Sequence, residues 1–207
     1  MRSRCSYAYL FETPPPPGSE KMRRYPAAPH PFVLDPRGWT SDPSSTTPLF
    51  EIRITLIGSG MAELNNVVEA MREAGRQGIG PDRAPFELVE VAAEAEAGNG
   101  NWQPMATTAP TPVTPLPPAP DSRCIRVRLE TPLRVKRREA LVTPSGFGLG
   151  DLFAPLLRRV SLLSYFHTAQ PLETDFAGLN TLARERPLRE SALVWRDFSR
   201  GSSRQKG

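Results

Sequence analysis

Two histidines, His30 and His167, are the only side chains of the sequence with an ordinary pKa near neutral pH. So small a number excludes a histidine-rich metal site. Two cysteines, Cys5 and Cys124, lie far apart without a CxxC partner, which predicts neither a disulfide framework nor a zinc site. We therefore expect no metal and no cofactor. Any catalysis would be acid–base chemistry that a histidine shares with a tyrosine or a cation.

His30 lies between two prolines in a stiff loop, with Tyr25 five residues before it and arginines close by. A metal-free ribonuclease needs a group that deprotonates a 2′-hydroxyl, a group that protonates the leaving 5′-oxygen, and a cation beside the phosphorane. His30 could be the base or acid, with Tyr25 as its partner. The alternative is a histidine that only hydrogen-bonds the turn. His167 ends an apolar stretch, where it is either catalytic or a cap for helix carbonyls.

Seven cations lie within 16 residues of the second half of the chain: Arg123, Arg126, Arg128, Arg134, Lys136, Arg137 and Arg138. On a strand, Arg126 and Arg128 would project to the same side, as expected of a surface that follows a phosphate backbone. A solvated charged face is the alternative. Only three of the 26 basic residues of the chain are lysines, and arginine suits nucleic-acid contact, although an arginine-rich genome would give the same bias.

Charge divides the chain in two. Residues 1–120 carry 10 basic and 13 acidic side chains, and residues 121–207 carry 16 and 9. A positive half of this kind attracts polyanions such as RNA. No segment approaches the length of apolar sequence that spans a bilayer, so we expect a cytoplasmic protein that is not bound to a membrane.

Paired glycines occur at Gly58 and Gly60 and at Gly78 and Gly80, but neither pair belongs to a nucleotide-binding motif. They more naturally serve turns and helix ends that need a positive φ or close packing. Gly78 and Gly80 can also bring the backbone near a nucleic-acid phosphate, so we count both among the expected RNA-binding residues.

Hydrophobic periodicity predicts an α+β fold. The expected strands span residues 5–11, 50–56, 86–91, 124–136 and 192–198, and the expected helices span 61–77, 149–166 and 173–186. Their order indicates two α+β units built on the same plan.

Prolines, 24 in all, gather in two stretches that interrupt these units. Residues 12–48 are expected to form a proline-rich loop within an N-terminal domain of residues 1–97. Residues 98–120 are expected to form a linker, followed by a C-terminal domain of residues 121–207. The four prolines at 14–17 could instead bind an aromatic-lined groove, which leaves open a protein-interaction scaffold.

Seven short motifs in the same order resemble the CRISPR-associated endoribonuclease family that processes precursor CRISPR RNA, within the RAMP superfamily. They are Cys5-Ser-Tyr-Ala-Tyr-Leu-Phe-Glu-Thr-Pro-Pro-Pro-Pro-Gly, Pro29-His-Pro-Phe-Val-Leu, Thr55-Leu-Ile-Gly, Gly78-Ile-Gly with Pro85-Phe-Glu-Leu-Val-Glu-Val, Thr131-Pro-Leu-Arg-Val-Lys, Leu156-Leu-Arg-Arg-Val-Ser-Leu-Leu-Ser-Tyr-Phe-His, and Trp195-Arg-Asp-Phe with Ser202-Ser-Arg-Gln-Lys. Together they touch most of the chain.

This resemblance implies two ferredoxin-like (RRM-type) domains in tandem, the second of them incomplete because the family's C-terminal glycine-rich loop is absent. It also implies metal-independent cleavage of repeat RNA that leaves a 2′,3′-cyclic phosphate and a 5′-hydroxyl, and other subunits of a CRISPR effector complex as partners. His30 corresponds to the histidine of the family's Pro-His-Pro-Phe motif. An RNA-binding relative that does not cut is the alternative.

Overall fold

A computed structural model of the chain describes residues 5–22, 26–40, 49–96, 98–105 and 124–197. The chain divides into two compact units. Residues 1–120 and 161–172 form the first unit, and residues 121–160 and 173–207 form the second. The domain boundaries expected from the sequence remain a prediction.

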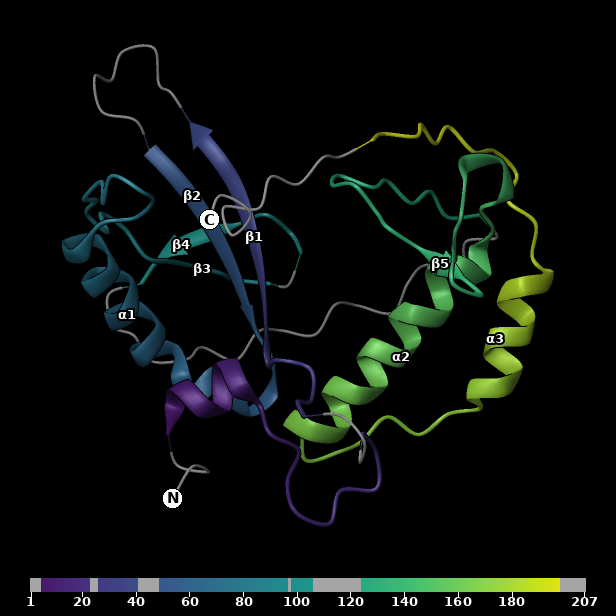
Figure 1. Ribbon diagram of the computed structural model, residues 1–207, viewed down its shortest axis with the longest axis horizontal. Helices are drawn as coiled ribbons and strands as arrows, with labels where there is room; N and C mark the ends of the chain where they lie inside the picture. The colour runs from purple at the N-terminus through teal and green to yellow at the C-terminus, as the bar shows by residue number, and fades with distance from the viewer. Residues whose placement is uncertain (1–4, 23–25, 41–48, 97, 106–123, 198–207) are drawn as a thin grey trace, which may run out of the picture. The chain divides into compact units, whose positions relative to one another are not determined.

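The first unit is built around an antiparallel ribbon of β1 (Phe32–Thr40) and β2 (Leu49–Leu56), in which Phe32 pairs with Leu56 (Figure 1). The expected strand at 50–56 is confirmed. β1 lies inside the segment expected to be a loop, and Pro36 hides it from sequence reasoning. The register shifts between Pro36 and Gly38, and a bulge of this kind is a place where a ribbon tolerates a residue without an N–H.

The observed helices match the sequence-based predictions better than the observed strands do. α1 (Leu64–Gln77) follows a 3-10 turn at Gly58–Glu63, and Gly78 ends it with a positive φ. α2 (Leu149–His167) and α3 (Phe176–Glu185) confirm the other two predictions (Figure 1). These stretches were long enough for the periodicity of apolar residues to identify them without ambiguity.

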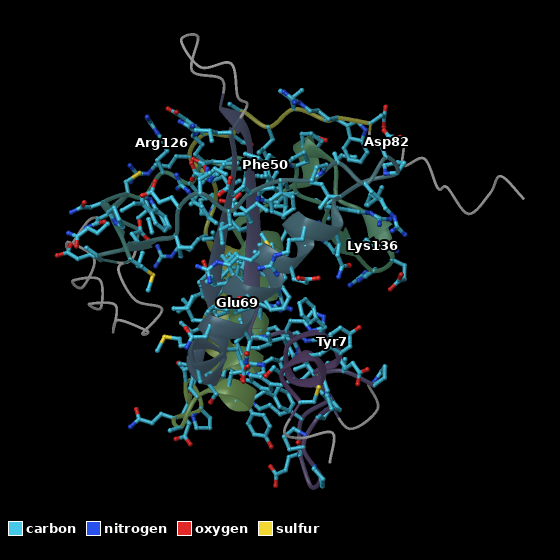
Figure 2. The ribbon with its side chains drawn as sticks, turned by 90° about the vertical axis from the view of Figure 1, so that its left-hand side faces the viewer. Tyr7, Phe50, Glu69, Asp82, Arg126 and Lys136 are labelled. Atoms are coloured by element: carbon cyan, nitrogen blue, oxygen red, sulfur yellow. The ribbon has the colours of Figure 1, made fainter. Side chains whose placement is uncertain are left out.

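Residues 5–11 do not form the expected strand; the structure has a π-helical turn at Ala8–Glu12. Aromatic residues four apart meet on one face of this turn, where the ring centroids of Tyr7 and Phe11 are 5.4 Å apart, and Ala8 and Leu10 are buried. Figure 2 labels Tyr7 beside the turn. Dense aromatic and aliphatic residues suit either element over so short a stretch, and contacts with the rest of the unit favour the helical form.

Three further expected strands are wrong for the residues that the structure describes. Residues 85–91, 124–135 and 191–197 have no ladder partner, and the regular pairing nearby is short: β3 (Ala92–Glu94) with β4 (Trp102–Pro104), and β5 (Lys136–Arg137) with β6 (Ala140–Leu141). Ile125 is 75% exposed and Val194 80%, so the apolar face expected there is not buried. Alternation identifies residues that could line a sheet, but a strand also needs a partner edge.

The described residues therefore form a mixed helix and strand fold with small antiparallel sheets, which confirms the α+β class. Two tandem ferredoxin-like domains remain a prediction. None of the helices in the described part of the chain is long and apolar enough to cross a membrane.

Candidate active site

His30 has a backbone that is fixed on both sides. The carbonyl oxygen of Pro29 lies 2.7 Å from Nε2 of His167, and the carbonyl of Pro31 accepts a 2.8 Å hydrogen bond from the N–H of Ile57. Pro31 is fully buried. Because proline also fixes φ at both neighbours, His30 is presented with little backbone freedom.

The imidazole of His30 is held as firmly as its backbone. Its Nδ1 lies 2.7 Å from the hydroxyl of Thr13, and its ring stacks on Phe32 with centroids 5.7 Å apart and planes inclined by 14°. Phe11 packs edge-on against Phe32, with ring centroids 5.5 Å apart. Nε2 of His30 has no hydrogen-bond partner among the residues that the structure describes. His30 as a whole is half-exposed, so a substrate can approach this residue.

Thr13 ends the π-helical turn and is 3% exposed. Its φ of 44° lies in the left-handed region, which a β-branched residue adopts only when its surroundings hold it there. Two backbone hydrogen bonds do so: its N–H donates to Ala8 at 2.7 Å, and its carbonyl accepts from Ala28 at 2.8 Å. The hydroxyl that meets His30 is therefore rigidly placed.

His167 is 2% exposed and both of its nitrogens have partners. Nε2 faces the carbonyl of Pro29, and Nδ1 lies 3.1 Å from the hydroxyl of Tyr9. A carbonyl can only accept, so Nε2 carries a proton, and in the neutral ring Nδ1 accepts from Tyr9. The geometry gives His167 a positioning role, in which it anchors the residue before His30 to the end of α2. The catalytic role expected for it remains untested.

Tyr9 is suited to donate that hydrogen bond. Burial raises the pKa of its hydroxyl, and the carboxylate of Glu63 raises it further, whereas a hydrogen bond with Ser59 opposes the shift. Tyr9 therefore stays protonated at neutral pH.

Glycines bring the end of α2 against the turn after β2. A Cβ on Gly58, whose φ is 55°, would lie 1.9 Å from the carbonyl oxygen of His167, and one on Gly60 would lie 2.8 Å from that of Pro31. Ser59, between them, donates its hydroxyl to the carbonyl of His167 at 3.3 Å. These glycines serve close packing, as the sequence analysis favoured.

The basic cluster contains cations on an exposed irregular segment and cations that contact carboxylates of the same unit. Arg126, Arg128 and Arg134 lie on an exposed irregular segment, and the guanidinium of Arg128 is 3.8 Å from Glu130 with its side chain 84% exposed. Figure 2 labels Arg126 and Lys136 among the side chains of the second unit. Lys136 is 3.4 Å from Glu139.

Arg137 is bound to neighbouring protein groups. It donates to both carboxylate oxygens of Asp151, with Nε 2.9 Å from Oδ1, and to the carbonyl of Gly146 at 2.9 Å. Asp151 also accepts from the N–H of Gly148 at the start of α2. This contact with Arg137 lowers the pKa of Asp151 and raises the pKa of Arg137. Arg137 is thus already committed to a carboxylate, whereas Arg138 lies in the turn between β5 and β6 with a φ of 49°.

The other expected site residues have simpler outcomes. A Cβ on Gly78 would lie 2.1 Å from the carbonyl oxygen of Arg83, so packing within the first unit accounts for this glycine. Gly80 has a φ of 76° and nothing within 4 Å of the corresponding position, and its carbonyl accepts a 3.2 Å hydrogen bond from the N–H of Arg83. Tyr25 and Arg123 lie outside the described residues.

Sequence reasoning missed the two side chains that contact the histidines, Thr13 and Tyr9. Both belong to the first motif quoted for the family resemblance, and Thr13 comes immediately before the four prolines. Nothing else in the sequence marks these two residues, because the turn that places Thr13 was expected to be a strand at 5–11.

Comparisons with known proteins give one match. Residues 1–115, more than half of the 207-residue chain, match a family model described as AF_1859_N: N-terminal domain. No curated protein and no solved structure matches the chain. The matched residues include His30, Thr13 and Tyr9. The chain therefore belongs to the AF_1859_N family, through an N-terminal domain that covers residues 1–115.

Proposed function

We propose that the chain is an RNA-binding endoribonuclease that cuts precursor CRISPR RNA within its repeats, without a metal ion. The observation that carries this proposal is His30. Its ring is fixed by Thr13 and Phe32, and its Nε2 has no partner among the described residues. A half-exposed histidine held in this way has the geometry of a general base.

In the proposed reaction the RNA supplies its own nucleophile. The 2′-oxygen forms a bond to phosphorus as its proton passes to Nε2 of His30, and the bond between phosphorus and the 5′-oxygen breaks. Water protonates the 5′-oxygen and later removes the proton from the imidazolium. The products are a 2′,3′-cyclic phosphate and a 5′-hydroxyl. Tyr25 remains a candidate for sharing the proton with His30.

Binding of the RNA backbone is assigned to the exposed cations of the second unit. Arg126, Arg128 and Arg134 are the principal candidates, because Arg137 is bound to Asp151. Arginine recognises phosphate with a planar fork, and an exposed irregular segment can adapt to a single strand. We propose two ferredoxin-like domains for the complete architecture, and association with other CRISPR effector subunits in the cytoplasm.

Incubation of the protein with a transcript of the CRISPR repeat in the presence of EDTA tests this function. On a denaturing gel, wild type should cut once per repeat, and the His30→Ala variant should be slower by about 10²- to 10⁴-fold, the usual contribution of a general base. Thr55→Val, an exposed change on β2, is the matched control and should cut at the wild-type rate. Equal cutting by His30→Ala and wild type would remove His30 from the mechanism.

RNA binding without cleavage is the second candidate, and the exposed arginines favour it independently of His30. It predicts that the repeat transcript is bound with an affinity that falls steeply with salt, and that the RNA is recovered intact.

A further inference from the structure

The proline tract leaves carbonyl groups of the π-helical turn without backbone donors. In a helical turn the carbonyls of Tyr9 and Leu10 would accept from residues four or five positions later. Those positions are Thr13, Pro14 and Pro15, and proline has no N–H. The N–H of Thr13 is already used, since it donates to Ala8 at 2.7 Å. Both carbonyls must therefore find a side-chain donor or solvent.

The hydroxyl of Thr13 is that donor. Its Oγ1 lies 3.1 Å from the carbonyl oxygen of Tyr9 and 3.2 Å from that of Leu10. Leu10 is 4% exposed, so water has little access to its carbonyl, and a buried acceptor without a donor is costly. The single proton of the hydroxyl is thereby committed to the backbone, shared between two acceptors.

This commitment decides the direction of the hydrogen bond to His30. The remaining contact of Thr13 Oγ1 is with Nδ1 of His30 at 2.7 Å, and an oxygen whose proton points elsewhere can only accept along it. Nδ1 of His30 must then carry the ring proton. In the neutral imidazole, Nε2 is left with its lone pair and can act as a base.

We propose that Thr13 is a positioning residue that fixes His30 as the Nδ1–H tautomer, so that Nε2 is the nitrogen that accepts the proton of the RNA 2′-hydroxyl. The role in cleavage rests on the proposed function, whereas the tautomer does not. Two of the four prolines, which first suggested only a spacer or a ligand, have a chemical consequence in this arrangement: because Pro14 and Pro15 have no N–H, they determine which nitrogen of His30 is basic.

The other histidine provides an internal reference. His167 is held in the opposite tautomer, because its Nε2 faces the carbonyl of Pro29 and its Nδ1 faces the hydroxyl of Tyr9. The chain contains only these two histidines. Two-dimensional ¹⁵N–¹H NMR of the full chain labelled with ¹⁵N-histidine should show two rings of opposite pattern at a pH where both are neutral, and His30→Gln assigns them.

Two substitutions at Thr13 and one control test the tautomer. Thr13→Val removes the hydroxyl but keeps the β-branched shape, and should abolish the Nδ1–H pattern of His30. Thr13→Ser keeps the hydroxyl and should retain that pattern. Thr55→Val removes an exposed threonine hydroxyl from β2 and should change neither ring. The His167 pattern, unchanged in all three, shows that the fold is intact.

An Nε2–H pattern for His30 in wild type would overturn the proposal, and so would an Nδ1–H pattern that survives in Thr13→Val. Loss of the His167 pattern in Thr13→Val would shift the test to Thr13→Ser and wild type, where an Nε2–H pattern for His30 again refutes it.

Cleavage of the repeat transcript tests the link to function. Thr13→Val should lower kcat by about tenfold, the factor expected for one net hydrogen bond, with KM unchanged, and Thr13→Ser should restore the rate. Unchanged kcat in a Thr13→Val protein whose tautomer has altered would refute the role of Thr13 in cleavage. If wild type does not cut the transcript, the proposed nuclease function fails, while the NMR pattern still decides the tautomer.

Discussion

Replacement of Gly58 by alanine tests the contact that holds the site together. Gly58 has a φ of 55°, and an added Cβ would lie 1.9 Å from the carbonyl oxygen of His167 and 2.7 Å from its carbonyl carbon. These are backbone atoms at the end of α2, so they cannot rotate away as a flexible side chain would. The end of α2 must shift, and the hydrogen bond from His167 to Pro29 shifts with it.

Two terms set the magnitude. A left-handed conformation costs an alanine about 1–2 kcal/mol more than a glycine. Forcing extra volume against a packed segment costs typically about 1–3 kcal/mol. The free energy of unfolding should therefore fall by about 2–5 kcal/mol in Gly58→Ala.

Gly80 supplies the matched control, because its φ is 76° and a Cβ there would have no neighbour within 4 Å. Gly80→Ala should pay only the conformational term, about 1–2 kcal/mol. Urea unfolding followed by circular dichroism measures both variants against wild type. The His167 ring signals, seen by ¹⁵N-histidine NMR, should move in Gly58→Ala and stay in place in Gly80→Ala. Equal losses of stability in the two variants would refute the close approach of α2 to the turn after β2.

Three further predictions concern single contacts. Tyr9→Phe removes the hydroxyl that lies 3.1 Å from Nδ1 of His167 and should lower the free energy of unfolding by about 1 kcal/mol, measured by urea unfolding. No change would argue against a stabilising hydrogen bond between these two groups. Arg137 lowers the pKa of Asp151, so the stability that Asp151 contributes is present above the ordinary aspartate pKa and is lost as the pH falls through the lowered value. The difference in unfolding free energy between wild type and Asp151→Asn should therefore shrink over that acidic range. A constant difference would argue against the ion pair of Arg137 and Asp151. In a filter-binding titration, Arg126→Ala and Arg128→Ala should each reduce the slope of log affinity against log salt for repeat RNA by about 0.7. Arg137→Ala should leave that slope unchanged, because Arg137 is bound to Asp151. An equal reduction of the slope in Arg137→Ala would show that Arg137 contacts phosphate.

The helices and the clearest strand could be predicted from the sequence because their information is local. α1, α2 and the residues of β2 each repeat apolar residues at a period that only one element satisfies. The strands expected at 86–91 and 124–136 failed for the opposite reason. Their alternation is equally regular, but a strand exists only where another segment offers its edge, and among the described residues of these two stretches only Lys136, in β5, has a ladder partner.

The sequence identified the two histidines of the candidate site but not the side chains that contact them. His30 was identified because histidine is scarce and prolines flank it, and both are properties of the sequence alone. His167 was identified for its chemistry; its burial and its contact with Pro29 support a positioning role, and its catalytic role stays a prediction. Thr13 and Tyr9 could not have been selected, since their importance comes from residues 17 and 158 positions away along the chain.

By itself the sequence determined which residues could do acid–base chemistry, where the cations gather and where prolines withhold N–H groups. Tertiary structure alone decided which histidine is accessible, that Arg137 is bound to Asp151, and that the hydroxyl of Thr13 lies against Nδ1 of His30. The physical reason is that chemical type and conformational preference belong to a residue, whereas burial and hydrogen-bond direction depend on partners that only folding brings within reach.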